Sequence, residues 1–316
     1  MNLFQALPSR FLLMPLSLLV AILLIISFPC PGTPSSDPVR FFRSGDGKIS
    51  IRNEHNGREA NVNLFDIDGR LNEKALNEID RVFNLPDDRK EEHISLRLLF
   101  LLDYFSDMIA PGKTIHLISG YRSPVYNKKL KDSGGNVART STHMDGMAID
   151  FYVEGVSGKA LWETIRGENC CGVGHYGGAS VHLDSGKPRF WEAATSKVGT
   201  RESEFNRKIY LSTEYDRYRQ GESLRFFLTS ISDFPFGISK AAVFEGKIGA
   251  TALQIHAKAE EECIMIRGRN ASRSIYATLP AGLEPGRYRV RLDFCSRPFE
   301  QMPASTLSNE IEIVKE

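Results

Sequence analysis

Hydrophobic side chains recur with the period of an α-helix at two places in the first half of the chain. One helix is predicted to begin after Asn72 and to stop before Pro86, and its buried face consists of Ala75, Leu76, Ile79, Val82 and Phe83. A longer, more hydrophobic helix covers about residues 95–109, with Ser95 as a suitable N-cap. Shorter helices are expected over about 124–131 and 157–166, each after a serine that can cap it.

Alternating hydrophobic and polar positions predict short strands around these helices. Residues 48–53 and 60–65 are expected to form a hairpin across Asn56-Gly57, a dipeptide that favours a tight turn. Further strands are predicted at 114–118, 148–153, 172–176 and 180–184, and the last two should pair across Gly177-Gly178. Helices mixed with short antiparallel strands indicate the α+β class.

After Trp191 the pattern changes. Residues 193–222 are polar and predict a linker. From Leu224 onward strands recur at 224–228, 252–258, 262–267, 286–294 and 309–314. We therefore expect residues 223–316 to form a C-terminal, sandwich-like all-β domain, in which no motif indicates chemistry.

The N-terminal segment has a different character. Residues 11–28 carry no charge, and Arg10 is the only basic residue before them. The run is long for the core of a signal peptide and close to the lower limit for a membrane span, and no small-residue cleavage site is evident. We expect 1–30 to be an uncleaved membrane anchor or, as the close alternative, a cleaved signal peptide, followed by a linker and lead-in over 31–47. Cys30 lies where a lipoprotein cysteine would, but the residues before it fit that role poorly. Each of these alternatives places the rest of the chain outside the cytoplasm.

Charge and cysteine content narrow the choice of partners. The chain has 40 basic and 39 acidic residues and a net charge of +1, so no nucleic-acid partner is expected. None of the five cysteines belongs to a Cys-x-x-Cys pair, which argues against a thiolate zinc site. Cys263 and Cys295 could form a bridge in an oxidising compartment, or they could remain buried thiols. Adjacent Cys170 and Cys171 are interpreted as packing residues, because a bond between neighbours is strained.

Two histidines and an aspartate stand out as candidate metal ligands. His143 and Asp150 lie seven residues apart, and His182 follows later in the chain. Two imidazoles and a carboxylate can hold a catalytic zinc ion (Zn2+) and leave one position open for water. Gly146 gives the backbone the freedom to bring His143 back beside the strand that carries Asp150. Ordinary structural histidines remain the alternative interpretation.

The motifs around these residues resemble a known family. They are Ser119-Gly120-Tyr121-Arg122-Ser123, then Ser141-x-His143-x-x-Gly146-x-Ala148-x-Asp150, then Val181-His182-x-Asp184. In order and spacing they are similar to those of the zinc D-Ala-D-Ala carboxypeptidases and murein endopeptidases, and most of all to their periplasmic bacterial branch. The resemblance covers about 48–192. It implies a hedgehog/D-Ala-D-Ala peptidase-like zinc domain, peptidoglycan as substrate, and an exported, periplasmic protein that its N-terminal segment holds at the inner membrane.

The resemblance also assigns roles to individual residues. His143, Asp150 and His182 match the zinc ligands. Arg122 matches the arginine that steadies the substrate carbonyl or the oxyanion, with a surface salt bridge as the alternative. Ser141 and Tyr121 are expected on the substrate side, although the Ser141 hydroxyl could instead stabilise its loop.

The general base is where the chain departs from the family pattern. Many relatives have an acid three residues before the last histidine ligand, where this chain has Ala179. Asp184 shares a strand face with His182 and is the first candidate, either as the base or as a partner of that ligand. His175 on the preceding strand is the second candidate, with a packed histidine as its alternative.

Three functions are therefore considered. The first is a zinc peptidase, of D,D-carboxypeptidase or murein endopeptidase type, whose C-terminal domain positions it on the wall or on a protein partner. The second, which Ala179 favours, is a weak or inactive zinc-containing module that binds the cell wall. The third is a peptidase whose substrates are peptides that do not belong to the cell wall.

Overall fold

A computed structural model describes residues 40–86, 92–135, 137–195, 204–247, 249–256 and 262–315. The predicted anchor or signal segment, and residues 31–39 of the lead-in, lie outside these ranges. Within the ranges, no helix combines the length and the apolar character that crossing a membrane requires.

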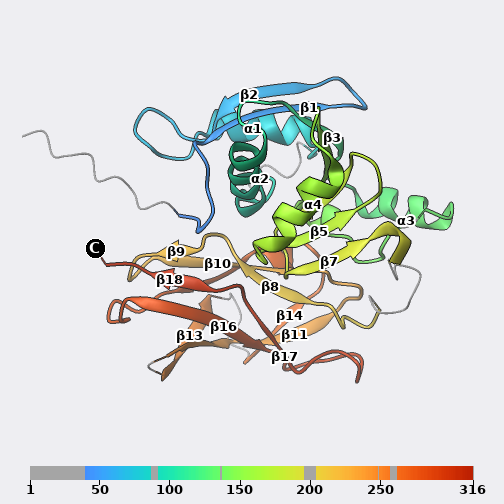
Figure 1. The fold of residues 1–316 in the computed structure, drawn as a ribbon. Coiled ribbons are helices and arrows are strands. Elements are labelled where there is room, and N and C mark those ends of the chain that lie inside the picture. Colours follow the sequence, from blue (N-terminus) through green and yellow to red (C-terminus); the bar gives the residue numbers. More distant parts are fainter. Residues whose placement is uncertain are drawn as a thin grey trace, which may run out of the picture. The chain divides into compact units, whose positions relative to one another are not determined.

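Seven strands form one sheet in the order β2-β1-β3-β4-β6-β5-β7 (Figure 1). Their bounds are β1 Lys48–Asn53, β2 Glu59–Asn63, β3 Ile115–Ser119, β4 Ala148–Val153, β5 Gly172–His175, β6 Val181–Asp184 and β7 Arg189–Glu192. Both predicted hairpins are confirmed, since β1 pairs antiparallel with β2 and β5 pairs antiparallel with β6. The sequence pattern misses β7, which pairs parallel with β5, because its four residues show no alternation of hydrophobic and polar positions and none of them is fully buried.

The four predicted helices of this part of the chain are present. They are α1 Glu73–Val82, α2 Leu96–Ile109, α3 Pro124–Asp132 and α4 Gly158–Gly167. Each begins after a residue whose side chain accepts a hydrogen bond from the first turn: Asn72, Ser95, Ser123 and Ser157. Helices and antiparallel strands thus combine in one domain, which confirms the α+β class.

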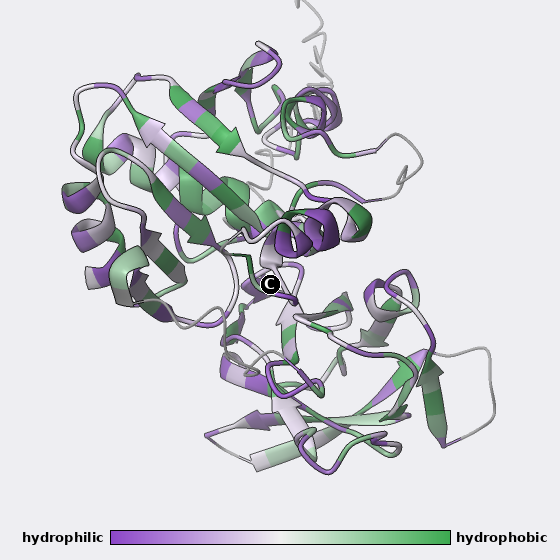
Figure 2. Cartoon of the chain, turned by 90° about the vertical axis from the view of Figure 1, so that its right-hand side faces the viewer, coloured by the Kyte–Doolittle hydropathy of each residue, from purple (hydrophilic) through white to green (hydrophobic). Residues whose placement is uncertain are grey.

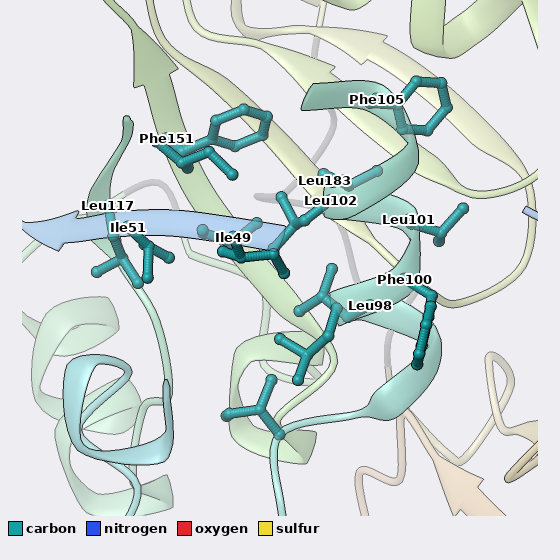
Figure 3. Packing of buried hydrophobic residues seen from close by; sticks show 14 of the residues in the cluster. Ile49, Ile51, Leu98, Phe100, Leu101, Leu102, Phe105, Leu117, Phe151 and Leu183 are labelled. Atoms are coloured by element: carbon teal, nitrogen blue, oxygen red, sulfur yellow. The ribbon is translucent and has the colours of Figure 1, made fainter. Parts of the chain in front are cut away.

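The hydrophobic core of this domain joins α2 to the sheet. Residues 98–102 and Phe105 of α2 are buried, and they cluster with alternate residues of the central strands (Figure 3). Hydrophobic and hydrophilic positions follow one another along those strands, as Figure 2 shows. One face of each central strand is therefore committed to the core, and the opposite face is available for polar side chains.

The C-terminal part of the chain is all β. Nine strands form a sheet in which eight follow the order β8-β10-β15-β13-β12-β16-β18-β9 and β17 pairs with β16. Their bounds are β8 Tyr210–Thr213, β9 Arg217–Tyr218, β10 Ser223–Thr229, β12 Ala241–Gly246, β13 Gly249–His256, β15 Ile275–Thr278, β16 Gly286–Asp293, β17 Ser305–Leu307 and β18 Ile311–Ile313. A separate pair consists of β11 Phe236–Ser239 and β14 Cys263–Ile266.

The predicted linker over 193–222 needs correction, because β8 and β9 lie within it. Leu211 and Tyr218 of these strands are fully buried in the core of the C-terminal domain. Each strand is short: β8 pairs with β10, beyond the intervening β9, and β9, which has two residues, pairs with β18 at the far end of the chain. A local pattern cannot reveal such pairings.

The cysteine predictions have mixed outcomes. Cys263 and Cys295 form a disulfide whose Cα atoms lie 5.8 Å apart, within the usual range, so the bridge was the right alternative. Cys170 and Cys171 are also joined, although no bond was expected between these neighbours and they were interpreted as packing residues. They lie where α4 turns into β5. Cys171 is buried, and Cys170 packs against the same core, so their packing role stands beside the bond.

Candidate metal centre

One row of residues runs across the sheet on the face turned away from the core. Strand register places Ser119 of β3 opposite Asp150 of β4, and Asp150 opposite His182 of β6. On the next strands, Gly174 of β5 lies opposite His182 and Trp191 of β7 lies beside Gly174. Residues that are directly paired share a sheet face, so Asp150 and His182 become neighbours through the hydrogen-bonded ladder alone.

Their side chains meet as the register requires. His182 Nδ1 lies 2.9 Å from Asp150 Oδ1, and both residues are buried. The Trp191 ring lies against His182, with 5.0 Å between the ring centroids. A Cβ atom at Gly174 would overlap the Trp191 indole, so this strand position needs glycine to let the tryptophan reach His182.

His143 reaches the pair from a turn. It lies in η1, a 3-10 helix over Thr142–Asp145, which Gly146 ends in the left-handed region with φ of 68°. His143 Nδ1 donates to the Gly120 carbonyl at 2.7 Å, which leaves Nε2 as the free nitrogen. That Nε2 lies 3.3 Å from both Asp150 Oδ1 and His182 Nδ1.

These three residues form a group that could hold a metal ion. One donor atom from each of His143, Asp150 and His182 lies within 4.8 Å of the others, and all three residues are buried. Burial lowers the pKa of His143, which favours the neutral imidazole that a metal needs. Burial works against the charge of Asp150, but the two imidazoles outweigh it and hold the pKa of this carboxyl well below its usual range.

Asp184 binds the other side of His182. Its Oδ2 accepts from His182 Nε2 at 2.8 Å and from Arg189 Nη2 at 2.6 Å, while its Oδ1 accepts from Arg189 Nη1 and from the Gly186 N–H, both at 2.9 Å. The residue is fully buried, yet Arg189 and His182 hold the pKa of its carboxyl far below the ordinary value. Both oxygens are occupied, and so acidic a group takes up protons poorly. This geometry favours a partner of His182 over a general base.

The negative charge around His182 favours any cation. Burial by itself would lower the pKa of His182, but its hydrogen bonds to the Asp150 and Asp184 carboxylates raise this pKa overall. The same field that retains a proton on the imidazole would also attract a divalent metal ion to Nδ1. Asp150 and Asp184 thus bind the two ring nitrogens of His182 from opposite sides, and an outer carboxylate such as Asp184 fixes the orientation of a metal-binding histidine.

Two further donors converge on Asp150. Arg122 Nη2 donates to Oδ2 at 2.7 Å, while its Nε donates to Ser119 Oγ at 2.9 Å. The Tyr176 hydroxyl donates to Oδ1 at 2.9 Å, and burial of the phenol together with the Asp150 charge raises the pKa of Tyr176. Sequence reasoning missed Tyr176. Strand parity could have found it, since residues 174 and 176 share a face and residue 174 lies opposite His182.

His175 does not join the cluster. It lies opposite Val181, whose side chain is in the core, so the pleat turns His175 away from the face that carries His182. Its Nε2 lies 3.4 Å from the Gly178 carbonyl. The prediction of His175 as a base was therefore misplaced by one strand position.

The two residues expected on the substrate side differ in placement. Ser141 precedes η1 and lines the cleft into which the cluster opens. Tyr121 instead packs against the hydrophobic core, and its N–H donates to the Phe83 carbonyl at 2.9 Å. The substrate role expected for Tyr121 is not supported. The chain passes from the end of β3 toward the core, so the Tyr121 side chain packs there.

The cleft beside the cluster has a volume of about 1400 Å³. His143, Tyr176, His182 and Trp191 line it from the first domain, and residues of the C-terminal sheet line it as well. Donor atoms held at the base of a cleft leave one side of a bound metal open to an incoming molecule.

The turn that carries His143 is also held by the C-terminal domain. The Asp145 carboxylate accepts from Arg269 Nη1 at 2.7 Å and from the Ser230 N–H at 3.0 Å. Arg273 donates to the Met144 carbonyl at 3.0 Å and pairs with Glu92 at 2.7 Å. The Asp145 and Arg273 side chains are 3% and 6% exposed, so these contacts are buried and the His143 turn is fixed from two sides.

Comparison with known proteins points to one family. The family model described as peptidoglycan L,D-endopeptidase MepK matches residues 44–191. Peptidoglycan L,D-endopeptidase MepK of Escherichia coli strain K12 is 30% identical over 144 residues, which are 45% of this chain and 79% of that protein. The protein of the same name from Shigella flexneri gives the same figures. The probable peptidoglycan L,D-endopeptidase MepK of Haemophilus influenzae is 37% identical over 82 residues, 25% of this chain and 42% of the relative.

Proposed function

The chain belongs to the family of peptidoglycan L,D-endopeptidase MepK, and we propose that it is an exported zinc enzyme that cleaves an L,D-amide bond in peptidoglycan peptides. The family makes it a metallopeptidase that acts on peptidoglycan. The bond, the zinc ion and the periplasmic location are our proposal. The observation that carries it is the convergence of His143, Asp150 and His182 at the base of a cleft.

The donor set fits zinc. Two imidazoles and one carboxylate are typical of catalytic zinc sites, and each imidazole here has its second nitrogen bound to an oxygen acceptor. We assign His143 Nε2, Asp150 and His182 Nδ1 as the ligand atoms. When bound, zinc supplies Lewis acidity and lowers the pKa of water to about 7.

The remaining residues have roles that follow from their contacts. Arg122 and Tyr176 present a cation and a hydroxyl beside Asp150, where they can donate to the oxyanion that develops on the attacked carbonyl. Ser141 lies on the cleft side of η1 and can contact the peptide. Asp184 orients His182 through Nε2 and keeps Nδ1 directed at the metal position.

The proposal extends to the domains. We assign residues 48–192 to a peptidase domain of the hedgehog/D-Ala-D-Ala peptidase type, and we assign the strands from β8 onward to a sandwich-like C-terminal domain. We also propose that the N-terminal 1–30 segment exports the chain and anchors it at the membrane. Expression with a C-terminal reporter enzyme that is active only after export tests that location, and a reporter that stays inactive would contradict it.

Digestion of isolated murein tests the activity. The zinc-loaded chain should release peptides with new termini at an L,D bond, identified by mass spectrometry, and His182→Ala should release none. Full zinc occupancy without new termini would support the inactive wall-binding module instead. Cleavage restricted to all-L peptides would indicate a peptidase with substrates outside the wall.

A further inference from the structure

The C-terminal sheet supplies a basic wall to the cleft that contains the metal cluster. Arg207 and Lys208 precede β8, and Arg287 and Arg289 lie on β16; all four are exposed and line the cleft. The chain as a whole has a net charge of only +1, so this wall is much more basic than the average surface. A cleft with one sign of charge concentrates ligands of the opposite sign.

Two of these cations have no carboxylate partner among the described residues. Arg287 pairs with Glu310, whereas no ion pair involves Arg207 or Arg289 in the part of the chain that the structure describes. Arg207 lies with its guanidinium carbon 5.7 Å from the centre of the Phe205 ring, and its side chain is exposed at the cleft. Unpaired guanidinium groups are suited to carboxylates, which they can bind through two parallel hydrogen bonds.

The basic wall faces the same cleft as the metal cluster. Arg207, Arg289 and Tyr210 of β8 line this cleft together with His143 and His182. The contacts of Arg269 and Arg273 with the His143 turn hold the C-terminal domain in this position.

The Escherichia coli relative leaves little room for such a wall outside the matched region. The match to the Escherichia coli protein spans 144 residues, or 79% of it, so about 38 of its residues lie outside the match. In this chain the strands of the C-terminal sheet extend from Tyr210 to Ile313, a much longer stretch. The basic wall is thus a feature of this chain that the family resemblance does not explain.

We propose that the C-terminal wall is a substrate subsite, in which Arg207 and Arg289 bind free carboxylates of the peptide whose amide bond lies at the metal cluster. The inference rests on the proposed function, since it names the substrate chemistry of that site. The C-terminal domain then selects peptides that carry carboxylates beside the scissile bond and holds them along the cleft. Its role is in substrate binding and not in the bond-breaking step.

The test uses the full zinc-loaded chain and soluble murein peptides in two forms, with free carboxylates and with the same carboxylates amidated. The double variant Arg207→Gln/Arg289→Gln should raise KM for the free form about three- to tenfold, with kcat within about twofold of wild type, as expected for the loss of two exposed charge contacts. For the amidated peptide, wild type and variant should have equal KM. Arg267→Gln is the matched control, since Arg267 is an exposed arginine of the same domain outside the cleft lining, and it should change neither value.

Two results would overturn the subsite: an unchanged KM in the double variant, or an equal rise in KM for the free and the amidated peptide. Thermal unfolding of each variant shows whether the fold is intact. If the wild-type chain cleaves no murein peptide, the proposed activity fails separately. Equilibrium binding of the same two peptides then decides the subsite without turnover, and weaker binding of the free form by the double variant supports it.

Discussion

Replacing Asp184 with asparagine separates the two roles that this residue could have. The carboxylate accepts four hydrogen bonds, one of them from His182 Nε2. Asparagine has nearly the same shape, so it can still accept from the Gly186 N–H and Arg189 Nη1 through its remaining oxygen. Its NH2 group, however, would face two donors, Arg189 Nη2 and His182 Nε2–H.

The conflict at His182 has a direct consequence for metal binding. To accept from the new NH2 group, the imidazole must carry its proton on Nδ1, the atom that lies 2.9 Å from Asp150 and faces the metal position. Losing such an outer partner typically weakens metal affinity by about 10- to 100-fold. This corresponds to roughly 1.4–2.7 kcal/mol at 1.36 kcal/mol per factor of ten. The unpaired Arg189 adds little, because its side chain is 43% exposed and reaches water.

Zinc affinity and kcat must be measured separately. Competition with a chromophoric chelator gives the affinity, and murein-peptide cleavage at saturating zinc gives kcat. We expect the affinity to fall by the factor above. Asp233→Asn, which removes a partly exposed carboxylate that pairs with Arg139, is the control and should leave the affinity unchanged. An unaltered zinc affinity, combined with a loss of about 10²- to 10⁴-fold in kcat, would refute the positioning role and identify Asp184 as a general base.

Four other outcomes are expected. Alanine at any member of the His143, Asp150 and His182 cluster should abolish stoichiometric zinc binding or weaken it severely in metal analysis after dialysis, and full occupancy in all three variants would disprove the ligand assignment. Tyr176→Phe should lower kcat by about 10- to 100-fold at unchanged zinc content through loss of an oxyanion donor, whereas a change confined to KM would point to substrate binding alone. Gly174→Ala should destabilise the fold by about 1–3 kcal/mol in urea unfolding, because the new methyl group overlaps Trp191. Gly167→Ala is the control and should not destabilise the fold, since its added Cβ meets nothing within 4 Å. Equal stability of the two variants would contradict the packing argument. Arg273→Met should lower the free energy of unfolding by about 3 kcal/mol, because it leaves buried carboxylates with one cation fewer. The exposed Arg287→Met is the control, and its loss should stay below about 1 kcal/mol. An equally small loss for Arg273→Met would mean that the His143 turn does not depend on Arg273.

Local patterns were sufficient for most elements of the first domain. The faces of α1 and α2 and the hairpins at Gly57 and Gly177-Gly178 depend on residues close together in the sequence, so periodicity and turn chemistry predict them. Strand β8 depends instead on β10, beyond the intervening β9, and β9 depends on β18 at the far end of the chain. Their few hydrophobic residues resemble a linker until those partners are known.

The metal cluster was predicted for reasons of a different kind. The His143, Asp150 and His182 motifs resemble a family pattern, but the residues meet because β4 and β6 pair in one particular register and η1 closes over them. No local rule gives that register. The prediction of His175 was wrong for this reason. An error of one position along the strand reverses the face to which each side chain points, so that His175 was chosen where Tyr176 faces the cluster.

Contacts between the two halves of the chain could not be anticipated at all. Asp145 and Arg273 are separated by more than a hundred residues, and each on its own resembles an ordinary surface charge. Their burial depends on the docking of a complete sheet against η1. A resemblance that ends near residue 192 carries no information about it.

The contact between Trp191 and His182 gives the chain a built-in optical probe. The chain has only two tryptophans, and the other, Trp162, is buried on α4 beside Lys159 and Arg166. Indole emission is sensitive to the charge of an adjacent ring, and His182, which we propose as a metal ligand, has its ring centroid 5.0 Å from that of Trp191. Occupancy of the metal position can therefore be followed by intrinsic fluorescence in the unlabelled wild-type protein, with Trp162 as a constant background.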